Sequence, residues 1–230
     1  MKKLFFQSIA VAALALFSLT SCNLGGIDNP ADPEEEQVDE RINVVIPQEL
    51  LDQIKDYMPI YDGVNPPNVE GTFLIDPYVY VYTSDGFYEA GHQIDSYLMR
   101  FYNQNMTTNT LDYNGRHVTQ DAFQNGNGVF ISGTGNNFTI YFNTEGESYG
   151  IYLKTALIVS GTLTADGIAN LRRAFVCIDK GDDPDGDLLD VGTFRVFKDN
   201  DELCERSEWP AEARSMRPKT VKNNLTETAK

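Results

Sequence analysis

The sequence predicts an all-β domain of mainly antiparallel strands, arranged as an up-and-down barrel of about 8–10 strands or, alternatively, as a β-sandwich. Tyr and Val alternate in YVYVYT at 78–83, and large apolar residues alternate with more polar ones in NFTIYFN at 137–143. Glycine-containing segments that favour tight turns accompany these runs: SDG, YNG, QNGNG, GTGNN, TEGE and ADG. Strands and helices do not alternate along the chain, which argues against a parallel sheet.

One amphipathic helix precedes the predicted strands. Residues 47–58, PQELLDQIKDYM, place large apolar side chains on one helical face: Leu50, Leu51, Ile54, Tyr57 and Met58. Pro47 suits the first turn of such a helix, and Pro59 ends it. We expect the apolar face to cover one end or one side of the main domain.

Residues 1–21 have the layout of a secretory signal peptide, with two lysines before an apolar run. The run is too short for a transmembrane helix. Leu19-Thr20-Ser21-Cys22 resembles the bacterial lipobox, which implies cleavage after Ser21 and acyl chains on Cys22 that hold the protein at a membrane. The alternative is an ordinary cleaved signal with an incidental cysteine. The lipobox predicts an exported lipoprotein of the outer membrane, on its periplasmic face or at the cell surface.

Composition divides the rest of the chain into three segments. Residues 22–41 are rich in Gly, Pro, Asp and Glu, which predicts a lipidated, flexible and self-repelling tether. Residues 42–209 are expected to form a single β-barrel domain that includes the helix, and 210–230 a polar, disordered tail. The acidic residues between Asp28 and Glu36 resemble the export signal of surface lipoproteins in gut Bacteroidetes.

The first predicted strand opens with PPNVEGT at residues 66–72. Together with GNNFTIYF and LIVSGTLTADGIANL, this opening resembles uncharacterised lipocalin-like lipoproteins of Bacteroidetes over roughly residues 60–200. Phe73 stands where the G-x-W segment of a lipocalin has tryptophan. The resemblance implies a calycin-type up-and-down barrel with a helix outside or capping it. It implies ligand binding only by analogy, because one fold serves many functions.

Charge excludes one class of function. The chain carries 34 acidic and 18 basic residues, a formal net charge of −16. Such a surface repels phosphate backbones, so nucleic acid is not an expected partner. It also repels anionic lipid, so acyl chains rather than a basic patch must provide membrane attachment. No cofactor is expected, because GTGNNF lacks the third glycine and the helix of a dinucleotide-binding loop.

Tyrosine is the most informative residue type for a binding surface. The chain has 12 Tyr and 13 Phe, and tyrosine combines a flat apolar body with a hydroxyl that suits ligand cavities. The candidate binding residues are Tyr78, Tyr80, Tyr82, Tyr97, Tyr141 and Tyr152. We expect a small apolar or glycan ligand. The alternatives are a filled core, as in an accessory or structural lipoprotein that docks onto an outer-membrane partner, and an exported hydrolase.

Two cysteines remain once Cys22 is assigned to the lipid. An oxidising compartment favours a disulfide between Cys177 and Cys204. A hairpin of 173–180 with 190–198 would instead place Cys177 opposite position 192, which leaves two buried free thiols as the alternative.

The acidic segment 178–190, IDKGDDPDGDLLD, is the only candidate for a metal site. Four carboxylates on a glycine-containing loop form a weak Ca²⁺ motif: Asp182, Asp183, Asp185 and Asp187. The register of an EF-hand fails here, so a solvated acidic loop is the simpler interpretation and no metal is expected.

No catalytic residues are predicted. His92 and His117 have no nucleophile or zinc-ligand motif around them. Carboxylates for glycosidic cleavage would have to come from a set that sequence cannot pair: Glu70, Glu89, Glu145 and Glu147.

Overall fold

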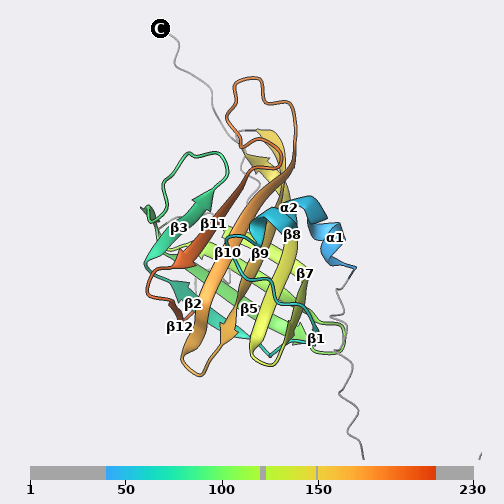
Figure 1. Cartoon of the computed structure of the whole chain (residues 1–230), viewed down its shortest axis with the longest axis vertical. Helices are drawn as coiled ribbons and strands as arrows, with labels where there is room; N and C mark the ends of the chain where they lie inside the picture. The colour runs from blue at the N-terminus through green and yellow to red at the C-terminus, as the bar shows by residue number, and fades with distance from the viewer. Residues whose placement is uncertain (1–39, 120–122, 149, 211–230) are drawn as a thin grey trace, which may run out of the picture. The chain divides into compact units, whose positions relative to one another are not determined.

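The strands close into an eight-stranded antiparallel barrel. The computed structural model describes residues 40–119, 123–148 and 150–210. Its strands are β1 (Val64–Asn65), β2 (Gly71–Ile75), β3 (Tyr78–Thr83), β4 (Gln93–Ile94), β5 (Tyr97–Asn105), β6 (Thr110–His117), β7 (Phe123–Thr134), β8 (Asn137–Ser148), β9 (Ile151–Leu163), β10 (Gly167–Lys180), β11 (Phe194–Asp199) and β12 (Leu203–Arg206). The ring runs β12-β2-β5-β6-β7-β8-β9-β10 and closes because β12 also pairs with β10 (Figure 1).

At three of the eight positions in the ring, two consecutive strands take the place of one: β2 with β3, β4 with β5, and β11 with β12. β2 pairs with β12 and β5, whereas β3 continues the same position and pairs with β11 and β4. The breaks lie at Asp76-Pro77, at 95–96 and at 200–202. When the two strands at each of these positions are counted as one, strands that follow each other in the sequence also lie side by side in the barrel. The predicted up-and-down order is therefore confirmed, and the short β1 adds only a parallel pair with β7.

Alternation along each strand separates the inside of the barrel from the outside. On β10, Leu171 and Phe175 belong to the inner cluster, whereas Ala174 and Val176 belong to a second cluster on the outer face. Arg173 lies two residues from both Leu171 and Phe175. Its side chain therefore points to the same inner face, because successive side chains of a strand point to opposite faces. The interior of the barrel therefore receives one charged residue from an otherwise apolar face.

The two ends of the barrel differ. One end carries the turns at 135–136 and 164–166, and its interior is filled by fully buried apolar side chains: Phe73, Phe101, Phe138, Ile168 and Leu171. We call it the filled end. The other carries the loops 84–92 and 181–193, and we call it the open end (Figure 1).

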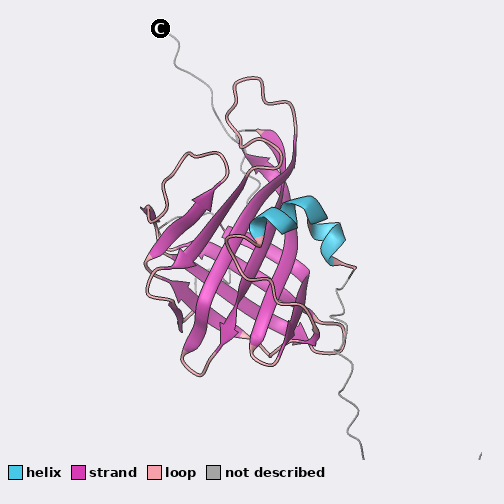
Figure 2. Cartoon of the chain, viewed as in Figure 1, coloured by secondary structure: helices cyan, strands magenta, loops and turns pink. Residues whose placement is uncertain are grey.

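Two short helices cover part of the outer wall. α1 (Ile42–Val45) and α2 (Gln48–Ile54) pack against the outer cluster on β7 to β11 (Figure 2). The predicted helix 47–58 is shorter than expected, since residues 55–57 form a turn. Its apolar face is nevertheless the one that contacts the barrel: Leu50, Leu51, Ile54, Tyr57 and Met58.

The predicted glycine turns are partly wrong. SDG, GTGNN and ADG lie at turns. YNG, QNGNG and TEGE instead lie within β6, β7 and β8. Two of these glycines are needed for close packing rather than for a turn: a Cβ on Gly126 would lie 2.7 Å from Val129 Cγ2, and Gly115 is described below.

Candidate functional site

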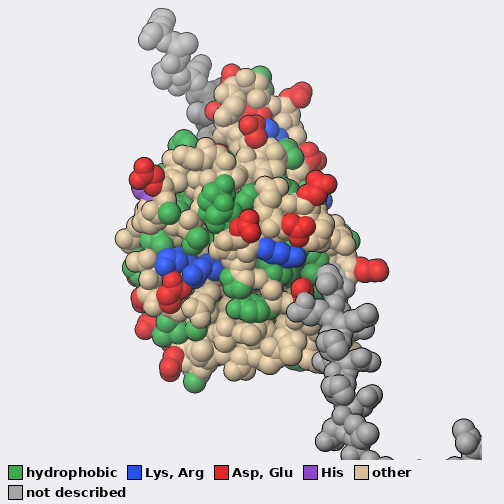
Figure 3. All heavy atoms as spheres, viewed as in Figure 1, with side chains coloured by type: hydrophobic (Ala, Val, Ile, Leu, Met, Phe, Trp, Pro, Cys, Tyr) green, Lys and Arg blue, Asp and Glu red, His purple; other side chains and the backbone are tan. Residues whose placement is uncertain are grey.

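A cavity of ≈ 320 Å³ lies inside the open end of the barrel. Strands from β3 to β11 contribute three tyrosines, two phenylalanines, three arginines and one histidine to its wall. The aromatic rings provide apolar surface, and the basic groups provide positive charge. The cavity contrasts with the surface in Figure 3, where acidic side chains are spread over the visible face and basic ones occupy few positions.

Arg173 is the centre of a hydrogen-bond network in this cavity. Its Nη1 donates to the Tyr78 hydroxyl at 3.0 Å, and its Nη2 donates to Gln124 Oε1 at 2.7 Å. The Tyr113 hydroxyl donates to that of Tyr97 at 3.2 Å, and the Tyr97 hydroxyl donates to Gln124 Oε1 at 2.9 Å. The Arg173 guanidinium also lies 4.5 Å from the ring centre of Tyr97, within range of a cation–π interaction.

Burial keeps two phenols of this network, those of Tyr78 and Tyr113, protonated. Burial is the main cause that raises the pKa of Tyr78 above its ordinary value, and the charge of Arg173 opposes it only in part. Burial raises the pKa of Tyr113 in the same way. The Gln124 amide and the protonated Tyr78 phenol therefore bond to the guanidinium but cannot neutralise its charge.

Gly115 makes room for two of these hydroxyls. A Cβ at this position would lie 2.1 Å from the Tyr113 hydroxyl oxygen and 2.4 Å from that of Tyr97. The tight turn expected at YNG is absent, because Asn114 and Gly115 are in a strand. Both residues lie within β6, where the Asn114 side chain bonds to that of Asn125 on the neighbouring strand.

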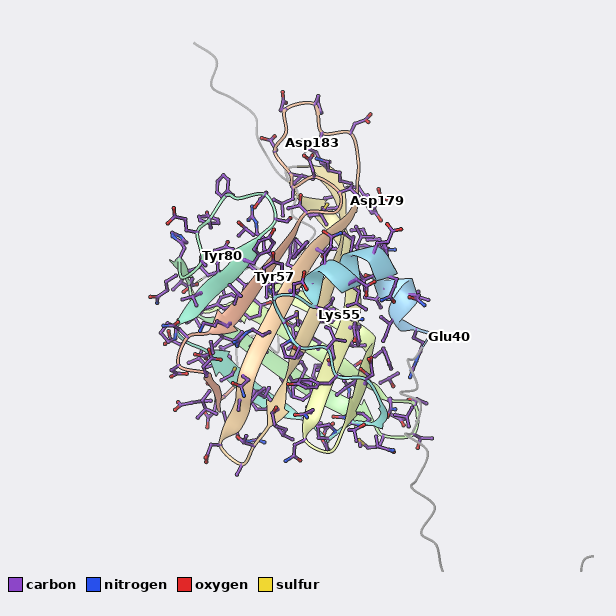
Figure 4. The ribbon with its side chains drawn as sticks, in the orientation of Figure 1. Glu40, Lys55, Tyr57, Tyr80, Asp179 and Asp183 are labelled. Carbon is purple, nitrogen blue, oxygen red and sulfur yellow. The ribbon has the colours of Figure 1, made fainter. Side chains whose placement is uncertain are left out.

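Aromatic side chains of the β3–β4 loop lie at the rim of the cavity. Tyr88 stacks on Tyr80 with ring centres 4.7 Å apart and on His92 at 4.6 Å. Arg195 of β11 forms an ion pair with Asp85 of the same loop. Tyr80, which also lines the cavity, is labelled in Figure 4. The stack and the ion pair together hold the loop against the opening.

The barrel wall has an opening between β7 and β8, which we call the side slot. These strands pair only from Phe130 opposite Tyr141 to Thr134 opposite Asn137. Residues of 124–129 pair with β6, but among the described residues none pairs with β8. A cavity of ≈ 460 Å³ lies here, and its wall includes Asn125, Asn143, Thr144, Glu145 and Glu147. Gln124 and Phe175 line both cavities, so the side slot adjoins the cavity at the open end.

The structure brings together half of the six predicted tyrosines. Tyr78, Tyr80 and Tyr97 line the cavity at the open end. Tyr141 faces the outer cluster, because the inner residues of β8 are its neighbours Ile140 and Phe142. Two others lie elsewhere: Tyr82 stacks on Tyr57 beside α2, and Tyr152 is 40% exposed. The pairing of β3 with β11 is irregular between Tyr80 and Tyr82, so Tyr82 does not point inward as Tyr80 does.

Cys177 and Cys204 are both buried free thiols, as in the second of the two alternatives, and the disulfide between them is not formed. Cys204 lies opposite Ile168 on β10, and Cys177 lies nine residues further along that strand. At roughly 3.3 Å per residue they are about 30 Å apart, whereas a disulfide requires Cα atoms within about 7 Å. Their sulfur atoms donate to carbonyl groups, of Leu189 for Cys177 and of Leu74 for Cys204.

The acidic loop is organised around one of the four predicted carboxylates. Asp183 accepts hydrogen bonds from the Lys180 amine at 2.9 Å and from the backbone N–H groups of Asp187 and Leu188. The bond to Lys180 is the main cause that lowers the pKa of Asp183. In the described ranges, no three His, Cys, Asp or Glu side chains are grouped to hold a metal ion, Asp182 and Asp185 included. Asp183 therefore shapes the loop, which lies at the open end (Figure 4).

The residues considered for catalysis are distributed over the barrel. Glu70 accepts from the backbone of Gln104, and Glu89 lies in the β3–β4 loop. Glu145 and Glu147 both line the side slot, where Glu145 pairs with Lys154 at 3.2 Å. His117 lines the cavity at the open end, and its Nδ1 lies 3.0 Å from the carbonyl oxygen of Asp95.

Sequence reasoning missed Arg173 and Gln124. The signal for Arg173 was present: in LRRAFVCI at 171–178 it has the parity of Leu171 and Phe175, so an inward charge could have been expected. Gln124 carried no such signal, because it lies in the glycine-rich segment that predicted a turn.

No family model, curated protein or solved structure matches the chain. In the part of the chain that the structure describes, neither helix has the length and apolar character needed to cross a bilayer.

Proposed function

We propose that this domain binds a small organic molecule in the cavity at the open end of the barrel. The contrast between the two ends supports this function. Apolar side chains fill one end, whereas the other keeps a cavity of ≈ 320 Å³ into which hydroxyl, amide and guanidinium groups point. Mostly aromatic walls with a few convergent polar groups are typical of small-molecule sites. The Tyr and Phe rings suit an apolar ligand body or the face of a sugar ring.

Filling this cavity should abolish most of the binding. Ile94 lines the cavity from β4, and Ile94→Trp would place an indole in it. We expect the wild-type chain to bind the neutral fluorophore N-phenyl-1-naphthylamine saturably, and Ile94→Trp to bind it roughly tenfold more weakly. Fluorescence titration measures both.

The matched control is Val44→Trp. Val44 lies on α1, outside the barrel, and is 79% exposed, so this variant should bind like the wild type. Absence of saturable binding by the wild-type chain, or equal affinities of both tryptophan variants, would contradict the proposed function.

Docking onto an outer-membrane partner has less support. A docking face requires a contiguous exposed apolar patch. The exposed large hydrophobic residues of the described chain lie on separate elements: Val44, Val64, Phe87, Met106, Val118, Tyr152 and Val191.

We further propose that acyl chains on Cys22 attach the domain to the outer membrane. Cys22, the signal peptide, residues 23–39 of the tether and the tail from residue 211 lie outside the described residues. The support is the lipobox-like LTSC together with the acidic segment that follows it. Cys22→Ser should abolish incorporation of radiolabelled palmitate and release the chain from the membrane fraction. Labelling that persists in Cys22→Ser would overturn the anchor.

A further inference from the structure

The cavity at the open end contains a buried positive charge without a negative partner. Arg173 is only 5% exposed. None of its hydrogen-bond partners is a carboxylate: they are the hydroxyls of Tyr78 and Tyr97 and the amide of Gln124. Its Nε has no partner among the described residues. A buried ion costs several kcal/mol of desolvation that only a close opposite charge and full hydrogen bonding can offset.

The surrounding groups do not supply that opposite charge. Burial keeps Tyr78 and Tyr113 protonated, as described above. The cavity wall contains two further arginines, Arg116 and Arg195, and none of its described residues is Asp or Glu. Asp85 of the β3–β4 loop is paired with Arg195. In a chain of net charge −16, the described wall of this cavity thus has cationic side chains and no anionic ones.

The donors around Arg173 also favour an anion. The Tyr78 hydroxyl accepts from Arg173, and no hydrogen bond uses its own proton among the described residues. A guanidinium has five N–H donors in a planar fork that matches a carboxylate. The site thus offers both a fixed charge and a free donor, whereas a neutral ligand would leave the charge uncompensated.

Resting on the proposed function, we propose that the cavity selects organic anions, with a carboxylate or similar head group bonded to Arg173 and an apolar body against the aromatic wall. Tyr78, Tyr97 and Gln124 orient the guanidinium. The aromatic residues Phe175 and Phe197 contact the body of the ligand. Arg173 is thereby the residue that determines specificity.

Decanoate and 1-decanol test this proposal, because they differ only in the charged head group. Isothermal titration of the wild-type chain should show decanoate bound at least about tenfold more tightly, as expected for a charge-assisted hydrogen bond. Arg173→Met should reduce the preference to less than about twofold, while 1-decanol binds as before. Arg206→Met, at the filled end beside Phe73, is the matched control and should keep the wild-type preference.

Each outcome separates the selectivity from the binding function. Equal binding of both probes by the wild-type chain would overturn anion selection and leave the binding function standing. Binding of neither probe would overturn anion selection, and would overturn the binding function as well if the fluorophore also failed to bind. A preference that survives Arg173→Met would overturn the role of Arg173.

A second variant keeps the test decisive if Arg173→Met fails to fold. Arg173→Lys retains the charge without the planar fork, so it should keep a preference for decanoate that is weaker than that of the wild type. An undiminished preference in Arg173→Lys would contradict recognition by the guanidinium.

Discussion

Replacing Gly167 with alanine should lower the free energy of unfolding by roughly 3 kcal/mol, because it forces apart the strands that close the barrel. Gly167 of β10 lies opposite Glu205 of β12, at one end of the three-residue pairing that completes the ring. A Cβ at Gly167 would lie 2.2 Å from the backbone carbonyl oxygen of Cys204. A backbone atom cannot turn aside as a side chain does, so β12 has to move. Urea unfolding followed by circular dichroism measures the loss.

Gly146→Ala is the matched control for this substitution. Gly146 also lies within a strand, β8, but nothing is within 4 Å of the position its Cβ would occupy. This variant should unfold at the wild-type urea concentration or slightly above it. If Gly167→Ala were as stable as Gly146→Ala, pairing of β12 with β10 would not be needed for the stability of the barrel.

The second large effect expected is a loss of stability between about pH 4 and pH 7 that depends on Asp199. This carboxyl is 1% exposed, and its Oδ2 accepts the Asp76 N–H at 3.0 Å, which ties the break between β11 and β12 to that between β2 and β3. Burial raises its pKa to about 7, whereas an unfolded chain has an Asp pKa of about 3.9. Protonated Asp199 therefore stabilises the fold. That contribution is complete below about pH 4 and is lost as the pH rises through 7.

Asp199→Asn should remove this dependence while it retains an oxygen that accepts the Asp76 N–H. Between pH 5 and 8.5 the wild type should lose on the order of 2 to 3 kcal/mol more unfolding free energy than the variant. Asp182→Asn, an exposed acid in the β10–β11 loop, should follow the wild-type profile. Parallel profiles of the wild type and Asp199→Asn would show that Asp199 is ionised throughout this range.

The sequence was sufficient to predict the fold class, because alternation is a local property of each strand. Runs such as NFTIYFN place Phe138, Ile140 and Phe142 in the core without any knowledge of partners. Turn prediction was weaker, since glycine serves two purposes. At 135 it allows the turn between β7 and β8, whereas at 115 it leaves room for the hydroxyls of Tyr113 on the same strand and of Tyr97 on neighbouring β5.

The candidate site was only partly predictable, because it too depends on contacts between strands and not only on local patterns. Tyrosines could be identified, but whether each faces inward depends on strand irregularities, such as the one that separates Tyr82 from Tyr80. The network around Arg173 joins residues up to 95 positions apart. No local sequence pattern therefore shows that the guanidinium has no acidic side chain among its hydrogen-bond partners. Barrel closure brings these residues together, and it is a property of the whole domain.

Because of the side slot, the barrel wall should open locally at a lower free-energy cost between β7 and β8 than elsewhere. Beyond Phe130 opposite Tyr141, the described part of β8 that faces the side slot has no strand partner in β7. Outward movement of the β8–β9 hairpin there breaks no described pair with β7 and disrupts only the last pairs of β9 with β10, such as Leu153 opposite Lys180. Such partial openings cost less free energy than global unfolding. A molecule bound near Phe175 would then escape at a rate governed by the fluctuation of one hairpin. The residence time of a bound molecule and the equilibrium stability of the fold can therefore change independently in this chain, and evolution can adjust either without the other.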